Sequence, residues 1–355
     1  MLKLPLRAAA IDIGTNSFRL LIADVTSSGL IPLTNILTTV RLGSRLEATR
    51  KLAPGPRKRA LETLATFKAA LREWQPHTWR ACGTAALRLA HNSRDFLAQA
   101  SDLLGGEVEI LRGEEEAALC LGGALAQLPA SASKKKGPLL LADVGGGSTE
   151  LAFTAAGTSP LPFPWRGGSE SPGSPLSVTS LSLGAVSLTE RWLPWTRTSP
   201  TEFAQLEQRL TEHLAPALAE LLPEGAHPPQ ILATGGTATA LAALDLDLVD
   251  YSVQRVQGHV LSTRRLTELT HSLIHLPGPE RSRLPGLDQR RGEIILAGAC
   301  VYQALVKLLN ARQMMISDAG LLEGILLSQV AVASRASGVG DEALPRINKK
   351  MFMIT

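Results

Sequence analysis

Two segments of the chain share one order of apolar and turn-forming residues. Residues 8–25, AAAIDIGTNSFRLLIADV, predict a buried strand, a turn at Gly14 and a second apolar strand. Residues 139–153, LLLADVGGGSTELAF, follow the same order. Alignment of Asp12 with Asp143 also aligns Gly14 with Gly145, Ser17 with Ser148, and Leu20 with Leu151. The sequence therefore predicts one hairpin that occurs twice, as in a duplicated domain.

The two predicted turns carry residues suited to binding phosphate. Glycine lets the backbone approach a ligand closely, and the N–H groups of such a turn form a concave donor surface that hydroxyl groups can extend. A single GGGS run is more often a flexible turn, but the second copy favours phosphate binding. The candidate phosphate-binding residues are Gly14, Thr15, Asn16, Ser17, Arg19, Gly145, Gly146, Gly147, Ser148 and Thr149.

The two copies differ in charge. Arg19 in the first corresponds to Glu150 in the second. Asp143 and Glu150 lie on the two arms of one predicted hairpin, where both carboxylates could reach Mg²⁺ directly or through water. An alternative role for Asp143 is structural, accepting hydrogen bonds from the N–H groups of its own turn. Together with Asp12, these two residues are the candidate metal ligands.

A third glycine turn lies in residues 231–244, ILATGGTATALAAL. The pattern predicts a strand, a turn at Gly235, Gly236 and Thr237, and an Ala/Leu-rich helix. The free N–H groups at a helix N-terminus suit phosphate or a ribose phosphate. Close packing between strand and helix is an equally good explanation of these glycines.

Composition limits the class of protein. The 355 residues suffice for two domains, and 45% hydrophobic residues are typical of a globular chain. The 36 Lys and Arg against 32 Asp and Glu give a net charge of +4, which permits an anionic substrate but does not indicate a nucleic acid polymer as partner. Cys82, Cys120 and Cys300 have no metal-binding spacing and predict reduced thiols.

No membrane partner is predicted. Asp12 interrupts the apolar start of the chain before a signal-peptide core can form. No later stretch reaches the roughly 18 uninterrupted apolar residues expected of a membrane span. These features predict a cytoplasmic location.

Ten motifs, in this order, resemble the exopolyphosphatase and guanosine pentaphosphate phosphohydrolase (Ppx/GppA) family of the actin, Hsp70 and sugar-kinase superfamily. They span nearly the whole chain, and although each one is weak alone, the ordered set is highly specific. They are DIGTNSFRLLI, VRLG, GTAALRLAHN, RGEEEAAL, DVGGGSTEL, LSLGAVSLTE, ATGGTATALAAL, QGHVLS, PGLDQRRGEIILAG and SDAGLLEGIL.

The resemblance implies an α/β fold of two ribonuclease H-like domains with an interdomain cleft. The first domain is expected over 1–125 and the second over 126–310. A C-terminal helix at about 311–333 is expected to pack back on the first domain, and 334–355 is expected to be a flexible tail. The length corresponds to the short, two-domain form of the family, for which a homodimer is expected.

The resemblance also assigns the catalytic residues. In RGEEEAAL it makes Glu116 the general base, and in GTAALRLAHN it makes Arg88 a phosphate contact. Without it, glutamates in a first helical turn would be read as complementing the helix dipole, and Arg88 as an exposed helical arginine. Arg41 and Arg291 are further candidates for anion contacts. The predicted role of His259 in QGHVLS is structural.

Some positions depart from the family pattern. Leu89 stands where an acidic residue commonly follows the arginine, Glu293 stands where Asp is usual, and Leu322 replaces a common Arg. None of the three is a proposed base or metal ligand. Two stretches, 131–138 and 155–177, are predicted to be exposed loops, and the first contains Lys134, Lys135 and Lys136.

The predicted function is removal of a terminal phosphate from polyphosphate or guanosine pentaphosphate, with Mg²⁺ as cofactor. Both substrates present a terminal phosphoanhydride, so the sequence does not choose between them. One alternative is an ATP-dependent kinase of the same superfamily, because the three glycine turns would also hold ATP. Another is a sensor that binds guanosine tetraphosphate or pentaphosphate without turning it over.

Overall fold

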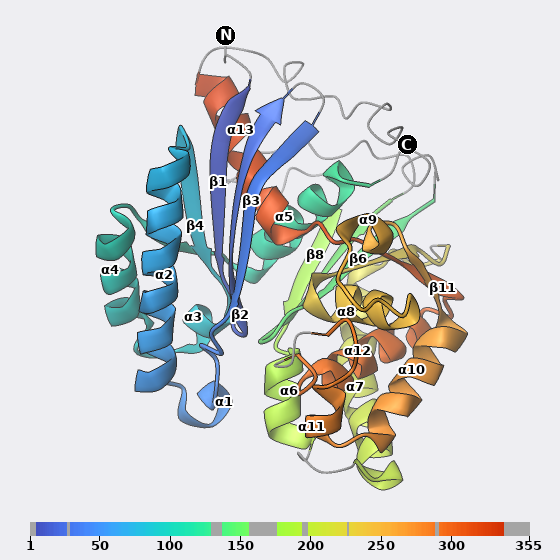
Figure 1. Cartoon of the computed structure of the whole chain (residues 1–355). Coiled ribbons are helices and arrows are strands. Elements are labelled where there is room, and N and C mark those ends of the chain that lie inside the picture. Colours follow the sequence, from blue (N-terminus) through green and yellow to red (C-terminus); the bar gives the residue numbers. More distant parts are fainter. Residues whose placement is uncertain are drawn as a thin grey trace.

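The chain folds into two lobes, each built on its own β-sheet (Figure 1). The computed structural model describes residues 5–26, 29–128, 137–155, 176–193, 198–225, 227–287 and 291–336. The three lysines predicted in an exposed loop lie outside these residues, as do most of the predicted loop 155–177 and nearly all of the predicted tail.

The first sheet has the order β3-β2-β1-β4-β5. Strand β1 pairs antiparallel with β2 and parallel with β4. Side chains alternate along β1, so that Ile11 and Ile13 pack in a core with helices α2 and α4 while Ala8 and Ala10 face the opposite side. The elements of this lobe are β1 (Leu6–Ile13), β2 (Ser17–Thr26), β3 (Gly29–Thr39), α1 (Leu46–Thr49), α2 (Pro54–Trp74), β4 (Thr78–Gly83), α3 (Ala85–Leu89), α4 (Ser93–Leu104) and β5 (Val108–Ile110).

The second sheet has the order β10-β11-β9-β6-β7-β8. Buried Tyr302 links β6 and β9 at the ends that lead into their glycine turns. Its hydroxyl donates to Thr234 O at 2.6 Å and accepts from Val144 N at 3.3 Å. The elements are β6 (Leu139–Val144), β7 (Thr149–Thr154), β8 (Leu176–Leu181), α6 (Ala185–Trp192), α7 (Pro200–Leu221), β9 (Gln230–Thr234), α8 (Gly235–Asp245), α9 (Val253–Val256), β10 (Val260–Ser262), α10 (Thr263–His275), α11 (Gly278–Arg281), α12 (Ile295–Leu308) and β11 (Gln313–Ile316).

The two sheets repeat one topology. The order β3-β2-β1-β4-β5 in the first corresponds to β8-β7-β6-β9-β11 in the second, and in each sheet the second strand is antiparallel to the first. This is the ribonuclease H-like arrangement, so the predicted α/β fold class is confirmed. Strand β10 is an addition at the edge of the second sheet, where it pairs antiparallel with β11.

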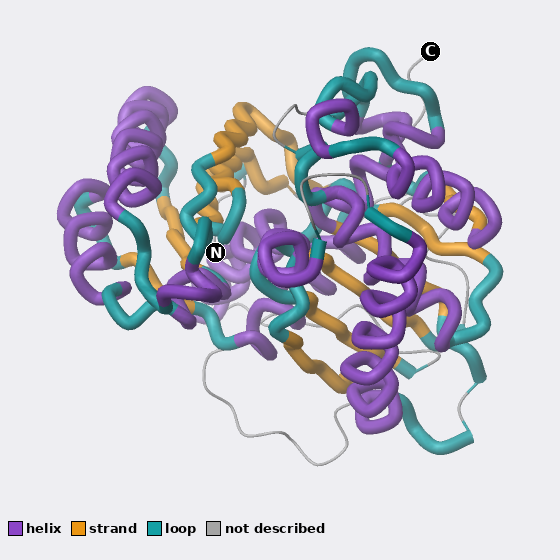
Figure 2. The backbone as a smooth tube through the Cα atoms, turned by 90° about the horizontal axis from the view of Figure 1, so that it is seen from below, coloured by secondary structure: helices purple, strands orange, loops and turns teal. Residues whose placement is uncertain are grey.

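Two helices lie between the sheets. Helix α5 (Gly113–Ala126) follows the last strand of the first sheet but contacts β7 and β8 of the second, whereas α13 (Leu321–Ala336) contacts β1 and β4 of the first. The two helices touch where Gly123 meets Gly320 and Gly324, leaving no room for a Cβ atom on Gly123. Viewed from below, the sheets lie side by side with helices on their outer sides (Figure 2). Each lobe therefore supplies a helix that covers the other lobe's sheet.

The C-terminal part differs from the prediction in one respect. Residues 313–316 form strand β11 of the second sheet, and the helix begins at Leu321 rather than near residue 311. The run QMMI is short and apolar, and such runs do not distinguish a strand from a helix by periodicity. The departure at Leu322 also has a structural consequence, because its side chain is fully buried between the lobes.

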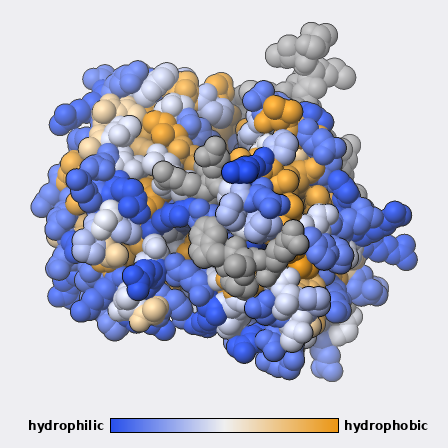
Figure 3. All heavy atoms as spheres, turned by 60° about the horizontal axis from the view of Figure 1, so that its bottom comes forward, coloured by the Kyte–Doolittle hydropathy of each residue, from blue (hydrophilic) through white to orange (hydrophobic). Residues whose placement is uncertain are grey.

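The surface agrees with a water-exposed globular chain. The face shown in Figure 3 is mostly hydrophilic, with apolar residues among the charged ones. No helix among the described residues has the length and hydropathy needed to cross a membrane.

Candidate active site

The hairpin predicted twice is present twice. In β1 and β2, Asp12 is paired with Arg19, and in β6 and β7, Asp143 is paired with Glu150. Both turns close by the same hydrogen bond, from Gly14 N to Ser17 O at 3.2 Å and from Gly145 N to Ser148 O at 3.0 Å. Each turn joins two strands that are adjacent in the sequence, which is why the local pattern predicts it.

The tips of the two hairpins lie against each other. A Cβ atom on Gly146 would come 3.1 Å from Asn16 N, and one on Gly147 would come 2.6 Å from Thr15 Oγ1. A side chain at Gly147 would therefore require the tips to shift, and one at Gly146 would be tightly crowded. The predicted phosphate-binding residues at the two tips thus border one shared space between the lobes.

Glu116 and Arg88 form an ion pair beside the second hairpin. Glu116 lies in the first turn of α5 and is 6% exposed. The Arg88 guanidinium donates to Glu116 Oε2 at 2.5 Å and lies 3.6 Å from Glu150 Oε1. It also donates to Leu111 O at 3.0 Å. Arg88 is therefore aimed at the carboxylates of the cleft and is not a solvent-exposed helical arginine.

The two carboxylates of the second hairpin are held by small donors. Ser180 Oγ donates to Glu150 Oε1 at 2.7 Å, and Cys120 Sγ donates to Asp143 Oδ2 at 3.1 Å. Sequence analysis missed both donors. Ser180 is paired with Glu150 between β8 and β7. This register could not be predicted from the sequence, because a long loop precedes β8. Cys120 lies one helical turn after Glu116. This four-residue spacing predicts that both side chains lie on the same face of α5.

Burial of four acidic side chains raises their pKa values. Desolvation is the main cause at Asp12, where the pKa rises to about 7, with Arg19 opposing and Asp143 adding to the rise. Desolvation also raises the pKa of Glu116 to about 7, against the attraction of Arg88. The pKa values of Asp143 and Glu150 lie above their ordinary range for the same first reason. Such perturbed carboxyl groups in one cleft are typical of a functional site.

These shifts predict that stability decreases as pH rises. The pKa values of Asp12 and Glu116 rise from 3.8 and 4.5 in the unfolded reference to about 7 in the fold. The folded chain therefore holds protons that the unfolded chain releases, and the resulting stabilisation is lost as pH passes through the folded pKa. We expect the melting temperature without divalent ions to fall between about pH 5 and about pH 8. Asp12→Asn should flatten this slope, and an unchanged slope in that variant would contradict the assignment.

The opposite side of the hairpins carries Arg19. Its half-buried side chain lies near Glu323, Asp318 and Asp12, whose charges raise the pKa of Arg19 overall although desolvation, the largest influence, lowers it. Among the described residues, no acceptor lies within hydrogen-bond distance of its Nε atom. Asp12 Oδ1 likewise has no donor within hydrogen-bond distance among these residues. The cleft thus contains buried polar atoms available to a ligand.

The third glycine turn borders the same cleft. Gly235 has a φ of +83° and lies directly against Asp143 Oδ1, so a Cβ atom has no room there. Arg291 donates to Gly236 O at 2.5 Å and so covers the start of α8. The Thr237 hydroxyl packs against Gly298 of α12. The turn therefore serves close packing at Gly235 and Thr237, while Gly236 and Arg291 lie together.

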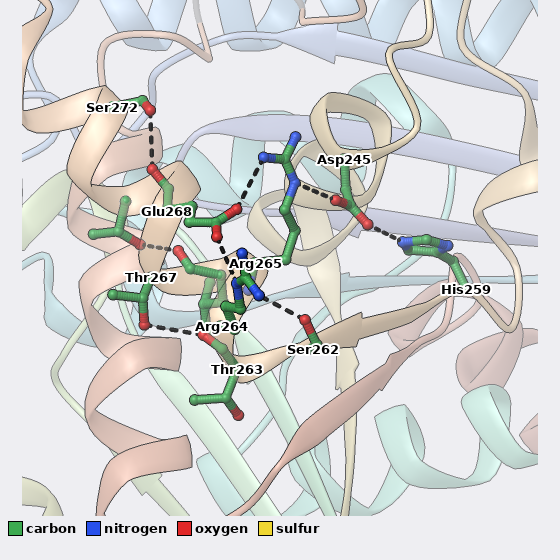
Figure 4. Close-up of polar contacts among 11 residues, drawn as sticks. Asp245, His259, Ser262, Thr263, Arg264, Arg265, Thr267, Glu268 and Ser272 are labelled. Carbon is green, nitrogen blue, oxygen red and sulfur yellow. Dashed lines mark hydrogen bonds and ion pairs between the residues drawn. The ribbon is translucent and has the colours of Figure 1, made fainter.

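Two further candidates have structural contacts. Arg41 forms an ion pair with Glu293, which joins the lobes. His259 lies 2.7 Å from Asp245 Oδ2, and Asp245 also accepts from Arg265 Nε at 2.7 Å (Figure 4). This network lies at the far end of α8 from the glycine turn, in agreement with the structural role predicted for His259.

The carboxylates of the cleft are candidate ligands of Mg²⁺. Within the described ranges, no three His, Cys, Asp or Glu side chains lie close enough together to hold a metal ion by themselves. Mg²⁺ commonly uses one or two carboxylates and completes its shell with water and substrate phosphate. The half-buried Asp143 and the buried Glu150, together with the unpartnered Asp12 Oδ1, fit that mode of binding.

The chain has two ribonuclease H-like lobes, and a glycine hairpin from each lobe meets the carboxylates in the space between them. These features are typical of enzymes that bind phosphate groups between two lobes. The sequence model of the Ppx/GppA phosphatase family matches residues 21–332, and the chain belongs to this family. Membership supports a phosphohydrolase activity.

Solved structures agree with this result. A Ppx/GppA family member from Aquifex aeolicus is 27% identical over 92% of this chain and 98% of its own, with a TM-score of 0.74. An exopolyphosphatase-like protein is 27% identical over 91% of this chain and 98% of its own, with a TM-score of 0.80. An exopolyphosphatase from Cytophaga hutchinsonii, 23% identical over 94% of this chain and 99% of its own, shares the fold with a TM-score of 0.77.

Proposed function

We propose that this protein hydrolyses the terminal phosphoanhydride of inorganic polyphosphate or guanosine pentaphosphate. The observation that carries the proposal is the position of the Glu116 and Arg88 pair beside two facing glycine hairpins. Hydrolysis requires an in-line water, a base to orient it, and positive charge over the equatorial oxygens of phosphorus. The chain has a residue suited to each requirement.

Glu116 is the proposed general base. Its raised pKa, about 7, lies near neutral pH, where the carboxylate is basic enough to accept a proton from water and a substantial fraction of it is still ionised. Backbone N–H groups of the Gly14–Ser17 and Gly145–Ser148 turns, with the hydroxyls of Thr15 and Ser148, are proposed to bind the terminal phosphate oxygens. Thr149 is not among the proposed phosphate ligands, because its hydroxyl donates to Leu183 O and anchors the hairpin.

Arg88 is proposed to bind the transferred phosphoryl group. In the structure its guanidinium is held by Glu116, Glu150 and Leu111 O at the edge of the cleft. A phosphate there would share these N–H donors, and charge-assisted hydrogen bonds of this kind are strong. Arg19 on the opposite side is proposed to contact the remainder of the substrate.

Mg²⁺ is the proposed cofactor, held by Asp143 and Glu150 with Asp12 near it. When bound, the ion would neutralise phosphate charge in the cleft. It would also lower the pKa values of the surrounding carboxyl groups, which burial now raises. A homodimer remains a prediction from the family resemblance, and a cytoplasmic location remains a prediction from the sequence pattern.

A phosphate-release panel tests the proposal. Purified protein is incubated with polyphosphates of several lengths, guanosine pentaphosphate or ATP, each with and without Mg²⁺. We expect Mg²⁺-dependent release of phosphate with no acceptor. Release that requires an alcohol or carboxylate acceptor would indicate the kinase, and tight nucleotide binding without turnover across substrates and metals would indicate the sensor.

A further inference from the structure

Two histidines lie beside each other on the surface of the second lobe, and the functions assigned above do not use them. His271 and His275 are both exposed on helix α10. Their ring centroids are 4.6 Å apart, and the ring planes are inclined by 72°. Helix α10 packs against α12 and α8 and lies on the outer side of the second lobe, away from the glycine hairpins (Figure 1). The pair is therefore separate from the cleft.

The geometry of the helix fixes this pair. Residues four positions apart lie one turn apart on the same face of an α-helix. The buried side chains of Leu266, Leu269 and Leu273 hold the opposite face of α10 against the core. This packing directs both imidazoles towards solvent, and each remains next to the other whenever the helix is formed.

The two rings are available to a ligand, unlike other histidines of the lobe. His259 Nε2 lies 2.7 Å from Asp245 Oδ2, and His213 Nδ1 lies 2.7 Å from Arg209 O. Among the described residues, no hydrogen bond or ion pair engages the ring of His271 or His275, whose contact is with each other. Their nitrogen atoms can therefore bind a ligand without breaking an interaction of the fold.

The position on the helix favours a cation. His275 is the last residue of α10, and the final carbonyl groups of a helix lack intrahelical donors and form the negative end of its dipole. Glu268 lies one turn before the pair, but its carboxylate is paired with Arg264 and Arg265. The helix therefore supplies two nitrogen ligands at an end where positive charge is stabilised.

We propose that His271 and His275 form a surface site for one divalent metal ion that prefers nitrogen ligands, with Zn²⁺ as the type. Imidazole suits Zn²⁺, Cu²⁺ and Ni²⁺, whereas Mg²⁺ prefers oxygen. Rotation of two such close rings can turn one nitrogen of each towards a shared ion. Because no group of three His, Cys, Asp or Glu side chains occurs among the described residues, water completes the coordination. The site does not depend on the proposed hydrolase function.

Calorimetric titration of the purified chain, without an affinity tag, tests the site. Zn²⁺ is added in the presence of excess Mg²⁺, which competes for the oxygen ligands of the cleft. We expect the wild type to bind one more Zn²⁺ per chain than either His271→Asn or His275→Asn, because both imidazoles are needed to chelate the ion. Asparagine at an exposed position should leave the fold intact, and the melting temperature without metal checks this.

A second measurement identifies the ligands. With Cu²⁺ as the probe, the electron paramagnetic resonance spectrum of the wild type should contain nitrogen hyperfine coupling from two imidazoles. Each single variant should lose this two-nitrogen signal. His227→Asn is the matched control, because His227 is exposed but outside α10, and it should keep both the Zn²⁺ stoichiometry and the Cu²⁺ spectrum of the wild type.

Three results would overturn the proposal. The first is equal Zn²⁺ binding by the wild type, His271→Asn and His275→Asn. The second is an equal loss in His227→Asn, which would indicate unspecific binding to surface histidines. The third is a wild-type chain that binds no Zn²⁺ under these conditions. Phosphate release with Mg²⁺ should be the same in the wild type and both variants, so a failure of the hydrolase proposal is recognised independently.

Discussion

Glu116→Gln is expected to lower kcat by about 10²- to 10⁴-fold, the usual contribution of a general base. The amide has nearly the shape of the carboxylate and can still contact Arg88, but it cannot accept a proton from water. KM should change little, because Glu116 acts on water and not on the substrate. Phosphate release measured at saturating substrate, with the melting temperature as a check on folding, tests this expectation.

A matched control separates catalysis from a general charge effect. Glu107→Gln removes one carboxylate from the same lobe at an exposed position just before β5, and we expect wild-type kcat. A folded Glu116→Gln protein that keeps full activity would remove Glu116 from the mechanism. Equal losses in both variants would indicate a charge effect.

Arg88→Met is expected to lower kcat/KM by about 10²- to 10³-fold, as for loss of one donor to the transition state. Methionine keeps most of the side-chain volume but supplies no positive charge. Arg88 also lowers the pKa of Glu116 against the stronger effect of burial. Without it the pKa of Glu116 should rise, so the acid limb of the kcat/KM profile should move to higher pH. A profile of kcat/KM against pH for both proteins measures the two effects together.

The control for Arg88→Met is Arg72→Met on α2, where the arginine is exposed near the end of the helix. We expect no change in kcat/KM or in the pH profile. Loss of activity in Arg88→Met without a shift of the acid limb would leave phosphate binding as its role, and would show that Arg88 does not tune Glu116. Retained activity would contradict the proposed phosphate contact.

The predictions from sequence were most successful where the structure is local. The turns at Gly14 and Gly145 depend on a few neighbouring residues, so their pattern could be recognised twice. The glycine turn at Gly235 was also predicted, with close packing as one of two explanations, but its partner was not, because Asp143 lies on β6 and meets the start of α8 only in the folded chain. The start of α13 was misplaced because residues 313–316 become a strand by pairing with β9 and β10, which are distant in the sequence.

The sequence by itself determined two glycine hairpins with charged arms and enough apolar residues for two domains. Its ordered motifs also determined the family. Only the tertiary structure decided that the hairpin tips touch, that α5 and α13 cover each other's sheets, and that Arg88 meets both Glu116 and Glu150. The reason is physical. A turn follows from the conformational preferences of adjacent residues, whereas desolvation and charge pairing depend on elements that are distant in the chain and meet only when both lobes are packed.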